Sequence, residues 1–177
     1  MTEQDKKRMV TAVFRDRTQA NRVYTWLRDR GYTADEINVL MSDQTRSAYA
    51  TNGEDDLVSS RTHAAEGMAT GGVIGTAVGA TLAAIAAIGT MVFIPGLSLV
   101  IAGPILAAFA GAGAGAVAGG LIGGLIGLGI PESNARAYEE ALRDGGVVIG
   151  VTPHVGEETA KIRNEFEKHQ GENVVVI

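Results

Sequence analysis

Residues 67–131 read GMATGGVIGTAVGATLAAIAAIGTMVFIPGLSLVIAGPILAAFAGAGAGAVAGGLIGGLIGLGIP and contain no Asp, Glu, Lys, Arg or His. The charged residues of the 177-residue chain, whose formal charges sum to −5, all lie in the two flanks. A folded segment of this length without a charge is expected to bury its apolar surface rather than leave it in water. The sequence therefore predicts that the segment is buried in a membrane or in a protein assembly.

Small residues recur every four positions in this uncharged segment. A four-residue spacing keeps them on one slowly drifting helical face, where a second backbone can approach closely. A glycine-rich loop is the alternative, because each glycine costs a helix about 1 kcal/mol relative to alanine, but a loop has no reason to hold one register. The helix-packing and self-association positions predicted for this glycine zipper are Gly67, Gly71, Gly75, Gly79 and Ala83, followed by Gly111, Gly115, Gly119, Gly123 and Gly127.

Two turn signals divide the segment into a helical hairpin. Pro95-Gly96 and Gly103-Pro104 are the predicted turn residues, because proline interrupts a helix and glycine favours a turn. The two predicted helices, about 67–92 and 104–129, would each be about 39 Å long at 1.5 Å per residue. That length exceeds the roughly 30 Å of hydrocarbon in a bilayer. The apolar tip at 97–102 is predicted to be buried as well, or to lie in a membrane interface.

The two flanks contain similar units. In each unit an alternating apolar strand precedes an amphipathic helix, a glycine that ends this helix, and a second strand. Equal spacing within the two units predicts an α+β, ferredoxin-like βαβ-(insert)-βαβ sandwich with two helices on one face. The predicted strands are residues 10–14 and 37–41 in the first unit and 147–151 and 174–177 in the second.

These patterns divide the chain into three parts. Residues 1–42 and 131–177 make the predicted ferredoxin-like domain, including an extra helix at 131–144 that begins where Pro131 suits the first helical turn. Residues 43–66 are rich in Ser, Thr, Asn and Asp without a sustained period, so we predict a flexible polar connector. Residues 67–130 are the glycine-zipper hairpin.

One junction carries a resemblance to a known family. The stacked four-residue glycine steps lead into Gly127-Leu128-Gly129-Ile130-Pro131-Glu132 and then into a helix that ends at Gly145-Gly146-Val147. This arrangement resembles the bacterial general stress protein family over most of the chain from Val10 to Val151. The resemblance implies a glycine-zipper hairpin inside a small α/β domain and a stress-induced, non-catalytic protein. It transfers no catalytic residues.

No catalytic, cofactor-binding or metal site is predicted. The pI near 5.2 gives no basic footprint for nucleic acid, and the lack of cysteine excludes disulfides and thiolate ligands. Residues 113–118 match the loose dinucleotide pattern G-x-G-x-x-A, but no strand precedes them. His63, His154 and His169 lack metal-ligand spacing, and His154 is predicted to be a solvated loop residue. The acidic cluster Glu54–Asp56 is predicted to be solvated, with cation binding left open.

Two functions of different classes follow for a non-enzymatic protein. In the first, the hairpin inserts in the inner (cytoplasmic) membrane, contacts lipid and drives self-association. The α/β domain would then lie in the cytoplasm, because both hairpin ends emerge on one side and we find no secretory signal. In the alternative, a water-soluble homo-oligomer in the cytoplasm buries its hairpins in a shared apolar core, because Gly, Ala and Thr insert less readily than Leu, Ile or Phe. A small-ligand sensor is a third hypothesis, for which no residue indicates a pocket.

Overall fold

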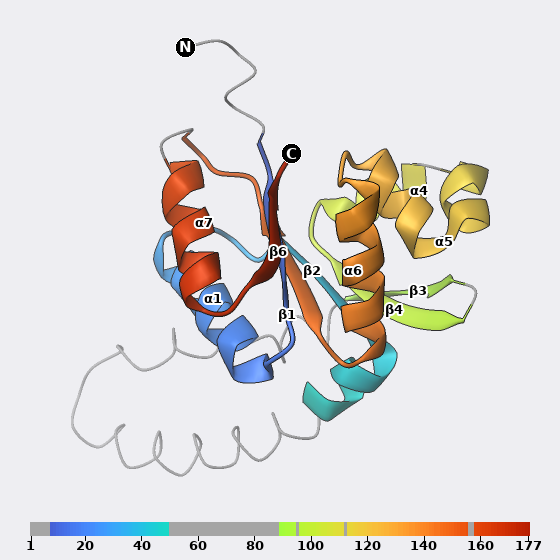
Figure 1. Ribbon diagram of the computed structural model, residues 1–177, viewed down its shortest axis with the longest axis horizontal. Coiled ribbons are helices and arrows are strands. Elements are labelled where there is room, and N and C mark those ends of the chain that lie inside the picture. The colour runs from blue at the N-terminus through green and yellow to red at the C-terminus, as the bar shows by residue number, and fades with distance from the viewer. Residues whose placement is uncertain (1–7, 50–88, 95, 112, 156–157) are drawn as a thin grey trace, which may run out of the picture.

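The computed structural model describes residues 8–49, 89–94, 96–111, 113–155 and 158–177 of the chain. These residues form an α+β fold around one six-stranded antiparallel sheet (Figure 1). The strands lie in the spatial order β3-β4-β2-β5-β1-β6. Their bounds are Val10–Phe14 (β1), Ile37–Ser42 (β2), Thr90–Ile94 (β3), Leu97–Ala102 (β4), Val147–Val151 (β5) and Glu172–Val176 (β6).

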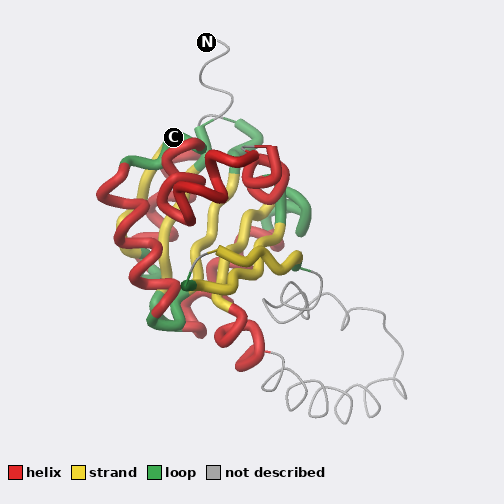
Figure 2. The backbone as a smooth tube through the Cα atoms, turned by 90° about the vertical axis from the view of Figure 1, so that its right-hand side faces the viewer, coloured by secondary structure: helices red, strands yellow, loops and turns green. Residues whose placement is uncertain are grey.

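Helices cover both faces of the sheet. In Figure 1, α1 and α7 lie on one side of the strands, while α4, α5 and α6 lie on the other. Figure 2, which views the second side, shows helices lying across the strands. The helix bounds are Arg17–Asp29 (α1), Ile105–Gly111 (α4), Gly113–Gly127 (α5), Glu132–Arg143 (α6) and Glu158–Lys168 (α7), and residues 43–49 are also helical.

Both predicted βαβ units are present, as β1-α1-β2 and β5-α7-β6. Their four strands are neighbours in the order β2-β5-β1-β6, and every adjacent pair is antiparallel. The Asp16 carboxylate caps α1 by accepting a hydrogen bond from the Thr18 N–H at 2.6 Å. Gly31, with φ +91°, follows the end of α1 in the left-handed conformation, as predicted. Local patterns therefore determine this part of the fold.

The predicted turn of a helical hairpin is a β-hairpin in the structure. β3 replaces the end of the predicted first helix, so the prediction of a helix is wrong at 90–92, whereas the predicted burial of the apolar tip at 97–102 is confirmed for Leu99–Ala102 in β4. Ile94 pairs with Leu97 across the turn, and β4 pairs with β2 along its length. Large apolar and β-branched residues such as Val100 and Ile101 suit a buried strand. The tip is therefore buried by joining the free edge of β2.

The predicted second helix, 104–129, is not continuous. Residue 112, between α4 and α5, lies outside the described residues, and the backbone within α5 leaves helical geometry at Gly120. Gly120 has φ +62° and ψ −157°, a region that only glycine occupies readily. This break lets the second half of α5 pack against α6, where Leu121 and Leu125 are buried. A straight helix of 26 residues would instead extend beyond the domain.

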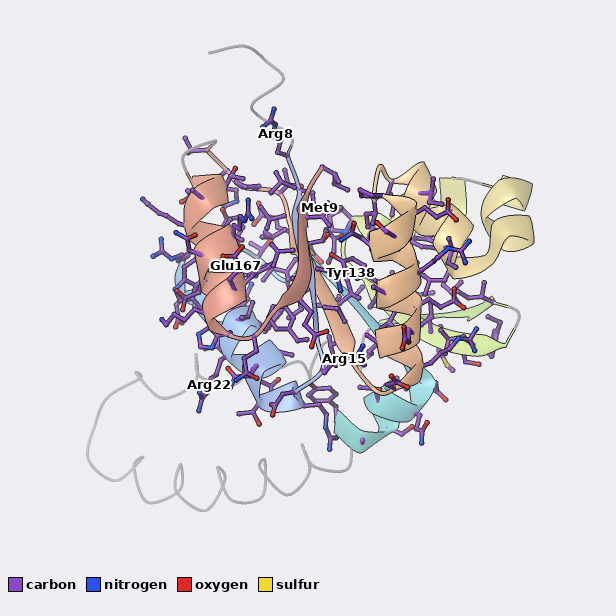
Figure 3. The ribbon with its side chains drawn as sticks, viewed as in Figure 1. Arg8, Met9, Arg15, Arg22, Tyr138 and Glu167 are labelled. Carbon is purple, nitrogen blue, oxygen red and sulfur yellow. The ribbon has the colours of Figure 1, made fainter. Side chains whose placement is uncertain are left out.

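A second hydrophobic core lies on the face of the sheet opposite α1 and α7. It joins side chains of α5 and α6 to Leu40, Leu99 and Val148 of the sheet. The predicted extra helix at 131–144 is α6, and its Tyr138 is fully buried between helix and sheet (Figure 3). Tyr138 Oη donates to the Asn173 carbonyl at 2.7 Å. Among the described residues, no helix combines the length and the hydropathy that a bilayer crossing requires.

The start of the predicted polar connector is ordered. Residues 43–49 are helical, and Thr45 and Tyr49 are buried. Thr45 N–H donates to Ser42 Oγ at 3.1 Å, which gives this helix a polar cap directly after β2. The prediction of a flexible connector is therefore wrong for these seven positions, and the rest of 43–66 lies outside the described residues.

Candidate self-association surface

The first half of the predicted glycine zipper, Gly67 to Ala83, lies outside the described residues, as do Glu54–Asp56 and His63. In the second half, Gly111 ends α4 and Gly115 lies within α5. A Cβ added at Gly119 or Gly127 would meet no atom within 4 Å. These two positions therefore face open space and make no close helix contact with the part of the chain that the structure describes. Their role in self-association remains a prediction.

Among the helical glycines whose surroundings are described, Gly124 makes a close contact, and it is outside the predicted four-residue series. A Cβ at Gly124 would lie 2.2 Å from Phe109 Cε1 and 2.8 Å from Phe109 Cζ. Phe109 belongs to α4, so the missing side chain at Gly124 lets α4 pack directly on α5. The neighbouring Gly123 is the member of the predicted series, and its packing role stays a prediction. The contact between Gly124 and Phe109 depends on the change of backbone direction at Gly120, which a sequence pattern does not show.

Gly124→Ala is expected to lower the free energy of unfolding by about 1–3 kcal/mol, because the Phe109 ring must move away from the added methyl group. Gly119→Ala is the matched control. It adds the same methyl group to the same helix in open space, and we expect stability to be unchanged or raised by up to about 1 kcal/mol. Chemical denaturation of the two variants measures the difference. Equal effects would contradict the packing of α4 on α5.

The predicted turn residues form two turns of different kinds. Pro95 lies outside the described residues, and Gly96, with φ +80°, connects β3 to β4. Gly103, with φ +88°, ends β4, and Pro104 lies in the turn before α4. A Cβ at Gly103 would lie 2.4 Å from the Ile37 carbonyl oxygen. In the structure Gly96 lies between two strands, and Gly103 and Pro104 lie between a strand and a helix.

The edge strand β3 is the most exposed apolar element that the structure describes. Phe93 is 74% exposed and Met91 is 40% exposed, while Val92 and Ile94 point to the second core. The side chain of Arg46, which is paired with Asp43 at 3.2 Å, reaches Met91 Sδ at 3.8 Å. An apolar strand at a sheet edge is a template for pairing with another chain. We therefore take β3 as the candidate self-association surface.

The opposite sheet edge, β6, lacks these properties. Its pairing with β1 is irregular between Thr11 and Val13. Asn173 has φ +51°, and Glu172 places a carboxylate on the strand. Irregular backbone and charge are common protections of an edge against further pairing. The two edges therefore differ in their capacity to bind another strand.

A polar cavity of about 680 Å³ lies where β1 leads into α1 and α6 leads into β5. Arg15, labelled in Figure 3, lines it and donates to Asp144 at 3.0 Å and to Glu172 at 3.2 Å. Hydrogen bonds to Glu172 and then to Asp144 raise the pKa of Arg15. Arg143, also in the lining, donates to Glu139 at 2.6 Å. Arg15 and Arg143 are thus paired with the protein's own carboxylates.

A second polar cluster surrounds His154. Its ring stacks on that of Tyr32 at 4.3 Å between centroids, and its Nε2 lies 2.8 Å from Glu36 Oε1. Tyr32 Oη donates to Glu158 Oε2 at 2.6 Å. Burial, followed by this hydrogen bond, raises the pKa of Tyr32 to about 12. His154 lies in the loop after β5 with its side chain 45% exposed, as predicted for a solvated loop histidine, and its contacts with Tyr32 and Glu36 join this loop to the one before β2.

Glu36→Gln is expected to lower the melting temperature at pH 7 and to have no effect near pH 2. The Thr33 N–H, then His154 and the Thr33 hydroxyl, hold the pKa of Glu36 at about 2, against 4.5 for a free glutamate. A carboxylate with a depressed pKa stabilises the fold above pH 4.5, and this contribution is lost as the pH falls through about 2. Thermal unfolding of both proteins from pH 7 to pH 2 measures it. A difference that does not change with pH would contradict an ionic role, and Glu132→Gln in an exposed helix pair is the control.

No protein-family model, no curated protein and no solved structure matches the chain. Among the described residues, no group of three or more His, Asp or Glu side chains has a metal-binding arrangement. Sequence reasoning missed three features: the β3 edge, the Gly124 contact and the His154 cluster. The alternating Thr90–Ile94 next to Pro95-Gly96 was the available signal for the first. The other two depend on contacts between distant residues.

Proposed function

We propose that the chain is a non-enzymatic protein that assembles with copies of itself in water and buries residues 67–88 of its uncharged segment in a shared apolar core. The observation that carries this proposal is the exposed apolar strand β3, with Phe93 74% exposed. β3 directly follows the uncharged residues 67–88. Exposed apolar surface of this kind marks interaction sites. The exposed strand and residues 67–88 are also adjacent in the sequence.

The topology supports an assembly over a hairpin that spans a membrane. Residue 49 and β3 both belong to the described domain, so any part of residues 50–88 that crosses a bilayer must cross back. Residues 67–88 are 22 positions long and sufficient for about one crossing. The other residues between the two points, 50–66, carry Glu54, Asp55, Asp56 and Arg61. A second crossing by these residues would place several charges in hydrocarbon.

The fold supports a scaffold role for the domain. We infer that β1, β2, β5 and β6 with α1 and α7 are a ferredoxin-like unit, to which β3, β4, α4, α5 and α6 add an edge and a second layer. The cavity and the His154 cluster are held by ion pairs and hydrogen bonds between the protein's own side chains. Together with the resemblance to bacterial general stress proteins, this favours a structural role in a stress response.

Fractionation without detergent, followed by sizing with light scattering, tests the proposal. We expect the protein in the soluble fraction as one defined multiple of 18.4 kDa. Gly75→Leu and Gly115→Leu are expected to reduce the size of the assembly, and Gly75→Ala is the matched small-residue control. Recovery only from detergent-solubilised membranes would favour the membrane hairpin instead. A monomer without detergent or lipid would contradict self-association altogether.

A further inference from the structure

The free edge of β3 presents a defined set of backbone groups. β3 and β4 are joined by two residues. In a hairpin with a two-residue turn, the two residues that flank the turn, here Ile94 and Leu97, are hydrogen-bonded to each other. Hydrogen-bonded pairs alternate with non-hydrogen-bonded pairs along an antiparallel ladder. The N–H and C=O groups of Met91 and Phe93 therefore point away from β4, toward the open edge. They are the groups that an added strand would bind.

β3 is complementary to a second copy of itself. In an antiparallel pair that overlaps along all five residues, Val92 lies opposite Val92 and Met91 lies opposite Phe93 of the second copy. Each Met91–Phe93 pair would exchange both of its outward hydrogen bonds. The two exposed side chains also fall on the same face of the sheet, because they are two residues apart. A methionine sulfur and an aromatic ring attract each other at such a contact.

We propose that β3 pairs with β3 of a second copy about a twofold axis through Val92, so that two six-stranded sheets join into one. This inference rests on the proposed self-association and names its contact. The most exposed apolar side chain among the described residues, Phe93, becomes buried against Met91 of the second copy. The strand itself carries no charge, and the Arg46 guanidinium next to Met91 is paired with Asp43. In a closed twofold pair the β3 edges of both copies are paired with each other, so they cannot add further copies to form an open fibre.

The twofold axis has a consequence for the glycine-rich helix. An axis perpendicular to the sheet keeps corresponding faces of the two copies on the same side. α5 contacts β3, so the α5 helices of both copies flank the axis on one face of the joined sheet. Strand pairing over five residues is small compared with the roughly 800 Å² per partner of a stable interface. The α5–β3 contact therefore brings a second element of each copy to the interface beside the paired strands.

Disulfide trapping tests the pairing directly. The chain has no cysteine, so Val92→Cys introduces the only thiol. In the proposed register the two copies of position 92 form a non-hydrogen-bonded pair with Cα atoms about 4.5 Å apart, within the range that a disulfide spans. Val174→Cys on β6, similarly half-buried, is the matched control. We expect rapid oxidation of the Val92→Cys protein to a covalent dimer and little dimer from the control. Equal dimer yields from both variants would overturn the proposal.

A charge at the edge gives an independent measurement. Phe93→Lys is expected to raise the dissociation constant of the β3 contact by at least about tenfold, because lysine on an edge strand opposes pairing. Val155→Lys, at another exposed apolar residue, is the control and should leave association unchanged. Both proteins are compared by analytical ultracentrifugation. If the wild type assembles and Phe93→Lys assembles equally well, the β3 pairing is wrong and self-association stands. If the wild type is a monomer, both proposals fail.

Discussion

Gly103→Ala is expected to lower the free energy of unfolding by about 2–5 kcal/mol, the largest effect of any single methyl group considered for this chain. Two costs combine at this position. The backbone is left-handed with φ +88°, which costs an alanine about 1–2 kcal/mol. The added Cβ would also lie 2.4 Å from the Ile37 carbonyl oxygen and 2.9 Å from Asn38 Cα. Both of these are backbone atoms, so no side chain can rotate away.

Gly31→Ala separates the two costs. Gly31 has φ +91°, nearly the same backbone conformation, but an added Cβ would meet no atom within 4 Å. We therefore expect Gly31→Ala to cost only about 1 kcal/mol. Urea denaturation of the two variants provides both values. Similar losses at the two positions would show that β4 does not approach β2 as closely as the structure has it.

Gly103 also positions α4, so its replacement is expected to disturb the junction between sheet and helix. The Ile105 N–H at the start of α4 donates to Asn38 Oδ1 at 2.7 Å, and this asparagine is buried. A displaced backbone at Gly103 would lengthen that hydrogen bond and leave a buried amide oxygen without a partner, which is costly. Loss of helix signal together with the stability loss is therefore expected by circular dichroism.

The flanks were predictable because each of their elements carries its own local pattern. Alternation marks β1 and β2, the i, i+3, i+4 spacing of Ala20, Val23 and Tyr24 marks α1, and Asp16 and Gly31 mark its two ends. Equal spacing in the second unit then fixes the order of four strands. Such signals survive in a single sequence, since they depend on residues within one or two turns of each other.

The structure of the uncharged segment was less predictable. The absence of charge predicts that the segment is buried away from solvent, but it does not specify helix or strand. A short apolar run such as Thr90–Ile94 is consistent with a buried strand or with part of a helix. The decision depends on the free edge of β2, which lies far away in the sequence. The four-residue glycine series favoured long helices, and the structure instead bends α5 at Gly120. Glycine therefore serves two opposed roles in this segment, as a packing surface and as a break.

The candidate sites also divide into those that local sequence patterns predict and those that depend on contacts between distant residues. Pro95-Gly96 and Gly103-Pro104 were located from local turn chemistry. The pairing of His154 with Glu36 joins residues 118 positions apart, and no local pattern predicts it. The exposed edge at β3 exists only because β4 and β2 pair, so it too required the fold. Surfaces that are created by the pairing of distant residues could therefore not be predicted from local sequence patterns.

Leu125→Ala is expected to lower the free energy of unfolding by about 2–5 kcal/mol, because it removes a fully buried side chain from the second core. The measurement decides where the glycine-rich helix is buried. In a membrane hairpin, or in a core shared only between copies, Leu125 would lie away from the folded domain and its truncation would leave the domain's melting transition unchanged. The structure packs it against α6 and the sheet, so the transition of the α/β domain itself should shift.

Ile126→Ala is the matched control for Leu125→Ala. Its side chain is the next one on α5, has the same number of carbon atoms and is 43% exposed. We expect a loss below about 1 kcal/mol, reduced further because alanine has the higher helix propensity. Differential scanning calorimetry at several protein concentrations separates folding from assembly, since only an assembly contribution depends on concentration. A concentration-independent loss confined to Leu125 would locate the helix in the domain, whereas equal, concentration-dependent losses would locate it between copies.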